Sequence, residues 1–193
     1  MKLKRILSLA LSGVLAVSML TACGGGGIGG ALSDRSSAIR SELNGAQDMM
    51  NYKANDRDLK DALYTVAGTL TANQVTGGVA TDAISNTVEQ LTGYGDIWLG
   101  EWDASAADET ATYVKVFVYN TDDEAFDTNR EVAYNIAKTL EVLDLKSDLA
   151  TDAGKISYSG NVGAYRTTVG SGDEAIHALV VGVAITQTVP AAE

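Results

Sequence analysis

Reactive side chains are scarce in this chain of 193 residues, which has one histidine, His177, and one cysteine, Cys23. A zinc site needs about three or four nitrogen, sulfur or oxygen ligands, and nucleophilic triads pair a histidine with a serine or cysteine. His177 alternates with the apolar residues Leu179 and Val181 and has no Gly-x-Ser-x-Gly partner. We therefore expect a histidine in the core or at a sheet edge that makes one hydrogen bond. The sequence predicts no metal site, no cofactor and no catalytic residue.

Oxygen-bearing side chains are spaced as in a calcium loop over the twelve residues from Asn120 to Glu131. Positions 1, 3, 5 and 12 carry oxygen ligands, but position 6 is Ala125, where an EF-hand loop requires glycine, and no helix precedes the segment. A strand-to-helix loop rich in capping residues accounts for the same composition. Paired carboxylates could in principle hydrolyse a glycoside, yet the acids of this chain are spread over helix faces and loops.

Two tryptophans flank a glycine in the apolar run Ile97–Trp102, which we predict as a short strand. Alternation would then place Trp98 and Trp102 on one face and Glu101 on the other. Such aromatic pairs sometimes stack on sugars or apolar ligands, although packing in a core or at a sheet edge is their commoner use. Trp98, Glu101 and Trp102 are therefore the candidate ligand-binding residues.

The first 23 residues have the pattern of an export signal. Cations at positions 2, 4 and 5 precede a largely apolar run, residues 6–20, that is short for a membrane-spanning helix. The run ends in Leu20–Cys23, which resembles a bacterial lipobox, whose cysteine is acylated and becomes the first residue of the mature chain. An ordinary secretory signal or a membrane anchor is the alternative. Because two or more acyl chains hold a protein firmly, the resemblance implies attachment to the bilayer through Cys23, on the extracytoplasmic side of the cell membrane.

The charge balance excludes some partners. Residues 1–22 carry three cations and no acid, so their removal would change the formal net charge from −11 to −14. Such a surface repels phosphate backbones and argues against nucleic-acid binding. Gly24–Gly30 contains six glycines and is typical of a flexible tether. We therefore divide the chain into a lipoprotein signal peptide (residues 1–22), a lipidated cysteine and tether (residues 23–32), and one globular domain (residues 33–189).

Helical periodicity dominates the N-terminal half of this domain. Three segments have apolar residues at helical spacing. Ser33 and Asp34 cap the first, Asn55 and Asp56 cap the second, and Gly93 ends the third. The apolar positions are Ile39, Leu43, Ala46 and Met49 or Met50 in the first segment, Leu59, Ala62, Leu63, Val66, Ala67 and Leu70 in the second, and Ile84, Val88 and Leu91 in the third.

The C-terminal half alternates with period two. Thr112–Asn120 has valines on one face and aromatic residues on the other, so we expect it to be covered on both faces. Gly163–Val169 and Ala175–Thr188 form a hairpin around Gly170–Asp173. Thr128–Glu131 predicts a capping box that opens a helix to about Leu145, with a buried stripe of Val132, Ile136, Leu140 and Leu143. These elements predict an α+β fold, a three-layer α-β-α sandwich with a small, mainly antiparallel sheet and a helical N-terminal half.

The order of these features resembles the CAP, or SCP-like, family, an α-β-α sandwich common in extracellular bacterial proteins. Leu43–Gln47 is similar to that family's opening helix motif, with Gln47 in place of arginine. Gly93-Tyr94 and Leu99–Trp102 are similar to its Gly-Tyr and Gly-Glu-Asn signature, with Trp102 in place of asparagine. The alanine-rich helix that begins near Leu59 and the closing hairpin extend the resemblance over about residues 36–188.

The chain also departs from that family. The family's cavity is built from two histidines and two acidic residues, and of these only Glu101 falls on a matching position. No histidine lies near Val75 or Ser147, where the pair would be expected. The resemblance therefore implies a divergent member without the metal-binding cavity.

Together these features predict a membrane-anchored extracytoplasmic lipoprotein whose non-enzymatic domain binds an unidentified ligand or protein at the cell envelope. An envelope hydrolase that uses carboxylates and a structural assembly subunit are the alternatives. A deep cleft that joins Trp98 or Trp102 to converging acids would favour the hydrolase, and a shallow surface with an apolar patch would favour partner binding.

Overall fold

The computed structural model describes residues 32–100, 102, 110–143, 145, 150–151 and 154–189. Its centre is a seven-stranded sheet in which three long strands lie side by side in the order β8, β9, β5. They span Ser157–Val169 (β8), Ile176–Thr188 (β9) and Ala111–Asn120 (β5). Each pairs antiparallel with its neighbour, so β9 is the central strand.

Four strands of two residues each line the edges of this sheet. β1 (Ser33–Asp34) pairs antiparallel with β8, and β2 (Tyr52–Lys53) pairs parallel with it. On the other edge, β3 (Gly78–Val79) pairs antiparallel with β5, and β4 (Gly95–Asp96) pairs parallel with it. Short strands of this kind limit the backbone that a sheet edge offers to another chain. A separate antiparallel pair is formed by β6 (Ala150–Thr151) and β7 (Gly154–Lys155).

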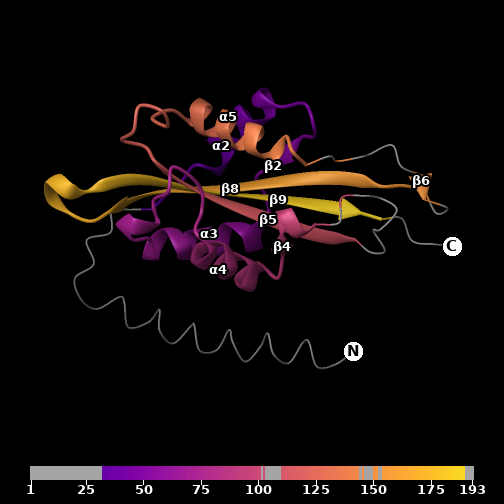
Figure 1. Ribbon diagram of the computed structural model, residues 1–193, viewed down its shortest axis with the longest axis horizontal. Coiled ribbons are helices and arrows are strands. Elements are labelled where there is room, and N and C mark those ends of the chain that lie inside the picture. Colours follow the sequence, from indigo (N-terminus) through magenta and orange to yellow (C-terminus); the bar gives the residue numbers. More distant parts are fainter. Residues whose placement is uncertain are drawn as a thin grey trace.

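Helices cover both faces of the sheet, as Figure 1 shows. α2 (Ser36–Ala46) and α5 (Asn129–Leu140) pack together on one face. α3 (Arg57–Thr69) and α4 (Asp82–Thr92) pack together on the other. Among the described residues, three short 3₁₀ helices connect the elements: η1 (Ala72–Gln74), η2 (Ile97–Leu99) and η3 (Gly172–Glu174). The predicted α+β fold, a three-layer α-β-α sandwich with a mainly antiparallel sheet, is confirmed.

The alternation of β5 divides the buried residues into two cores. Phe117 and Tyr119 point into the core beneath α2 and α5, where Ile39, Leu43, Ile136 and Leu140 are fully buried. Val114, Val116 and Val118 point into the core above α3 and α4 with Leu59, Leu63 and Val88. A strand between two cores needs apolar side chains on both faces, which is what the sequence predicted for Thr112–Asn120.

Paired glycines let α3 approach the sheet closely. Gly163 of β8 lies opposite Gly182 of β9. A Cβ atom built on Gly163 would lie 2.7 Å from Leu63 Cδ1, and one built on Gly182 would lie 2.8 Å from the same atom. Leu59 and Leu63 therefore fill the space that side chains at these two positions would otherwise occupy.

The helix boundaries follow most of the predicted caps. The side chain of Asp56 accepts the Leu59 N–H, Gly93 ends α4 in the left-handed conformation, and Thr128 forms the capping box with Glu131. α5, however, ends at Leu140 rather than near Leu145, although Leu143 is buried as expected.

The first helix also differs at both ends from the prediction. Ser33 and Asp34 belong to β1, because their backbone pairs with Arg166 and Tyr165 of β8. The helix starts at Ser36, whose N–H donates to Asp34 Oδ1 at 2.8 Å. It ends at Ala46, before the two methionines.

The closing hairpin is longer than the sequence predicted. β8 begins at Ser157 instead of Gly163, and the turn contains η3, with Gly170 and Gly172 at positive φ angles of 82° and 65°. Its turn extends beyond the helical layers at the left of Figure 1.

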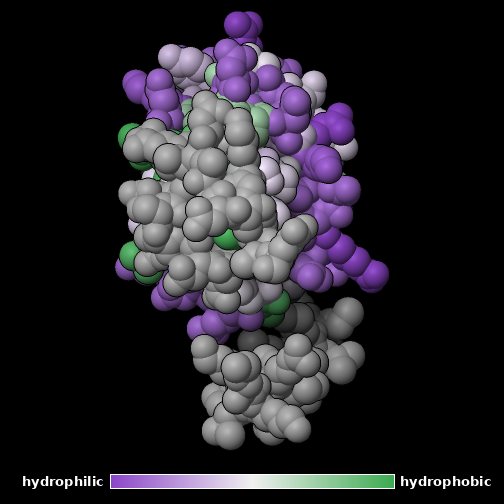
Figure 2. All heavy atoms as spheres, turned by 90° about the vertical axis from the view of Figure 1, so that its right-hand side faces the viewer, coloured by the Kyte–Doolittle hydropathy of each residue, from purple (hydrophilic) through white to green (hydrophobic). Residues whose placement is uncertain are grey.

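Figure 2 views the molecule from the right-hand side of Figure 1, and hydrophilic residues cover most of the described surface there, with small, separate hydrophobic spots.

Candidate functional site

The segment predicted as a strand around the two tryptophans is a turn. Gly95 and Asp96 form β4, and η2 follows at once. The carboxylate of Asp96 accepts the Trp98 N–H at 2.8 Å, and this cap starts the 3₁₀ turn. The predicted strand over Ile97–Trp102 is therefore wrong, because a local side-chain cap overrides the alternating pattern.

The structure places the two tryptophan rings in different surroundings. Trp102 is partly buried, packs against Tyr113 at a centroid distance of 5.0 Å, and donates from Nε1 to the Ile97 carbonyl at 2.9 Å. Trp98 is 40% exposed, and Lys115 Nζ lies 5.5 Å from its ring centroid. Trp102 thus serves core packing, and Trp98 keeps an accessible ring. The other two predicted site residues, Cys23 and Glu101, lie outside the described residues.

His177 is an exposed residue near the start of β9. Its Nδ1 lies 2.8 Å from Asp122 Oδ1, and its backbone N–H donates to Asp122 Oδ2 at 2.8 Å. The backbone hydrogen bond from His177 is the main reason why the pKa of Asp122 lies below its ordinary value of 3.8. The side chain of His177 therefore links the β5–α5 loop to the hairpin through one hydrogen bond, as predicted, but it lies exposed near the end of the central strand rather than in the core or at a sheet edge.

The oxygen-bearing side chains between Asn120 and Glu131, whose spacing resembles that of a calcium loop, stabilise turns in the β5–α5 loop. Asn120 Oδ1 accepts the Asp122 N–H at 3.0 Å, and Asp123 Oδ1 accepts the Ala125 N–H at 2.9 Å. Glu131 is held by the Thr128 hydroxyl, which is the main cause of its lowered pKa. Among the described residues, no group of three histidine, cysteine or acidic side chains converges as a metal site would require.

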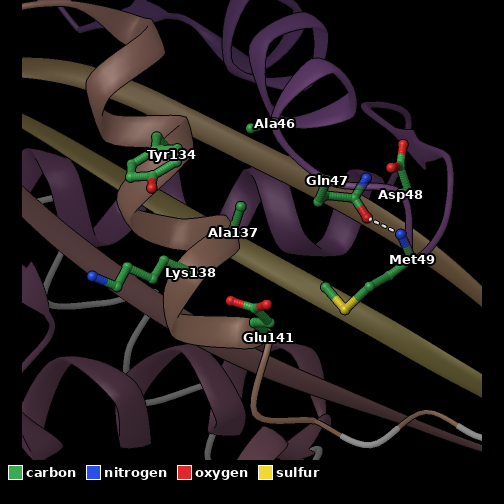
Figure 3. A pocket seen from close by; sticks show the side chains of 8 residues that line it. All are labelled: Ala46, Gln47, Asp48, Met49, Tyr134, Ala137, Lys138 and Glu141. Atoms are coloured by element: carbon green, nitrogen blue, oxygen red, sulfur yellow. Dashed lines mark hydrogen bonds between the residues drawn. The ribbon is translucent and has the colours of Figure 1, made fainter.

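A groove opens between the end of α2 and the outer face of α5 (Figure 3). Its volume is about 430 Å³, within the range of ligand pockets. Figure 3 shows the Met49 side chain reaching from the α2–β2 loop towards α5. The lining residues come from two segments of the chain: Ala46, Gln47, Asp48 and Met49 on one side, and Tyr134, Ala137, Lys138 and Glu141 on the other.

Hydrogen bonds from two polar side chains fix the loop that forms one wall of the groove. Gln47 Oε1 accepts the Met49 N–H at 2.7 Å and the Met50 N–H at 3.1 Å, and its Nε2 donates to the Met50 carbonyl at 2.7 Å. The Asn44 side chain holds both backbone groups of Tyr52: it accepts the Tyr52 N–H at 2.8 Å and donates to the Tyr52 carbonyl at 3.0 Å. The wall is therefore preorganised, so a ligand would not have to order it on binding.

The groove combines exposed apolar side chains with two acidic residues and one basic residue. Tyr134 is 63% exposed and Met49 is 37% exposed. Asp48 and Glu141 are exposed acids that bring negative charge to the rim, and Lys138 adds one positive charge. Tyr134 also borders a second, more open hollow on its other side, lined by Phe126, Arg130 and Asn135 among others. One aromatic side chain thus stands between two adjoining depressions.

The sequence reasoning missed this groove. The signal was present in α5, where Val132, Ile136 and Leu140 define the buried stripe and Tyr134 lies off that stripe. An aromatic residue on the polar face of an amphipathic helix lies outside the buried stripe that packs the helix on the core. What the sequence did not show is that Met49 would lie across from it.

The comparisons with known proteins add no relative. No family model, curated protein or solved structure matches the chain. The likeness to the CAP family therefore stays a prediction. In the described part of the chain, no helix has both the length and the hydrophobicity to cross a bilayer.

Proposed function

We propose that this chain is an extracytoplasmic lipoprotein, held to the membrane through Cys23, whose non-enzymatic domain binds a partner protein in the groove between α2 and α5. The observation that carries the binding role is the exposure of Tyr134 and Met49 on the two walls of one preorganised groove. Exposed aromatic and methionine side chains are enriched in the centres of protein interfaces.

The charges around the groove indicate the chemistry of the partner. Asp48 and Glu141 outnumber Lys138 at the rim, and the whole chain is strongly acidic. A complementary partner would place one apolar side chain between Met49 and Tyr134 and basic groups beside it. Carboxylates open to water suit such pairing better than they suit hydrolysis, which requires acids in a shielded site.

A photoreactive phenylalanine analogue in place of Tyr134 tests the proposal in the native host. Tyr64 of α3 is the matched control, because it is also an exposed helical tyrosine, at 54%, but lies on the opposite face of the sheet. We expect irradiation to give a discrete cross-linked product from position 134 and none from position 64. Products of equal yield at both positions, or none at position 134 in the host, would contradict the proposal.

The charge argument has its own measurement. Once the cross-linked protein has been identified, its binding to the purified full chain should weaken as salt is raised, and Glu141→Gln should weaken it at low salt. Tyr134→Ala should abolish binding while leaving the melting temperature unchanged, because the ring is mostly exposed. Binding that survives Tyr134→Ala would place the interface elsewhere.

A further inference from the structure

Lys115 is the most buried cation that the structure describes in an ion pair. Its side chain is 7% exposed, and its Nζ lies 3.0 Å and 3.2 Å from the two carboxylate oxygens of Asp96, which is itself 24% exposed. The other lysine–aspartate pair in the described chain, Lys60–Asp34, is closer at 2.7 Å but more open, at 27% and 45%. Burying a charged pair costs more than its attraction returns unless its geometry is excellent, so this arrangement calls for an explanation.

The surroundings of the pair shield the amine and include a second acid. Trp98 lies over the Lys115 amine. Glu89 of α4 is close enough for the charges of Asp96 and Lys115 to act on it. Partial burial, followed by the charge of Asp96, raises the pKa of the Glu89 carboxyl above its ordinary value of 4.5, although Lys115 opposes this.

We propose that Lys115 and Asp96 condense to form an intramolecular isopeptide bond. The arrangement holds a buried amine 3.0 Å from a carboxylate oxygen, so that the effective concentration of the two groups is very high. A bond here would fasten β4, which is only two residues long, to the middle of the neighbouring strand β5. It would close a covalent loop around η2 and so fix the exposed side chains of Trp98 and Leu99.

The chemistry balances without a co-reactant. A proton passes from the Lys115 ammonium to the Asp96 carboxylate, which leaves a neutral amine and a neutral acid. The nitrogen lone pair then attacks the carboxyl carbon, a C–N bond forms, and one C–O bond breaks. The departing oxygen takes up a proton and leaves as water, while the nitrogen keeps one hydrogen as an amide.

Trypsin provides a direct test, because it cuts after an unmodified lysine but not after an acylated one. The chain has no lysine or arginine between Lys60 and Lys115, or between Lys115 and Arg130. Digestion of the denatured full chain should therefore lack the peptide 61–115. It should instead yield the peptide 61–130, uncut at Lys115 and lighter by one water, with the link between Lys115 and Asp96 located by fragmentation.

Two controls make the result unambiguous. Lys115→Arg keeps the charge and the trypsin site but lacks a primary amine, so it should release the peptide 61–115 at its full mass. Cleavage after Lys60 should go to completion in the same digest, since the Lys60–Asp34 pair is too exposed to condense. Release of the unshifted peptide 61–115 from the parent chain would overturn the proposal, as would loss of water at Asp96 with Lys115 still cleaved.

Discussion

Replacement of Gly182 by alanine should destabilise the domain, because α3 packs directly on this glycine. An alanine Cβ would lie 2.8 Å from Leu63 Cδ1 and 3.0 Å from Leu59 Cδ1, whereas ordinary contacts begin at 3.4 Å. β9 is hydrogen-bonded on both sides, to β8 and to β5, so it cannot move away from the helix by itself. We expect the free energy of unfolding to fall by about 1–3 kcal/mol, as for other overpacked cores.

A second substitution isolates the cause. Leu63 is fully buried, and Leu63→Ala alone should cost about 2–5 kcal/mol through lost burial and the cavity left behind. In the double variant, the space vacated by the Leu63 methyl groups accepts the new Cβ of residue 182. The double variant should therefore lose less stability than the two single changes added together, by about 1 kcal/mol.

Urea unfolding followed by far-UV circular dichroism measures all of these values. Gly45→Ala in α2 is the matched control, because a Cβ there meets no atom within 4 Å. Alanine is the better helix former, so this variant should gain about 0.5–1 kcal/mol. Additive losses in the double variant, or a neutral Gly182→Ala, would show that the closeness of α3 to the sheet does not limit the residue at position 182.

Two further predictions concern the membrane anchor and the hydrogen bond between Asp122 and His177 at the hairpin. Cys23→Ser should release the protein from the membrane fraction without lowering its melting temperature, since Cys23 precedes the folded domain; a variant that still sediments with membranes would contradict anchoring by lipid. The carboxyl carbon of Asp122 should titrate below 3.8 in an NMR experiment, because its carboxylate accepts the His177 N–H. Because folding lowers the pKa of Asp122, its hydrogen bond with His177 stabilises the fold at pH values above the pKa of the unfolded chain. This stabilisation is lost as the pH falls through the pKa of the folded protein. A titration midpoint at or above 3.8 would refute that contact.

Features that depend on a few neighbouring residues could be predicted from the sequence. Thr128 and Glu131 satisfy each other's backbone groups within one turn, and Asp56 caps α3 within three residues. The two-faced alternation of β5 likewise required cover on both sides of the sheet, whatever the order of the strands. The prediction failed at η2, where the single hydrogen bond from the Trp98 N–H to the Asp96 carboxylate outweighed an alternating pattern over six residues. No pattern in the hydropathy of Ile97–Trp102 distinguishes the two outcomes.

The chain alone therefore determined its α+β class, most of its helix caps and the two faces of β5, because these follow from hydrogen bonds and burial along short stretches of backbone. Only the tertiary structure placed Met49 opposite Tyr134 and paired the Lys115 amine with the Asp96 carboxylate. The walls of the groove lie more than eighty residues apart in the sequence. Their meeting depends on how α2 and α5 pack across the sheet, which no local spacing encodes.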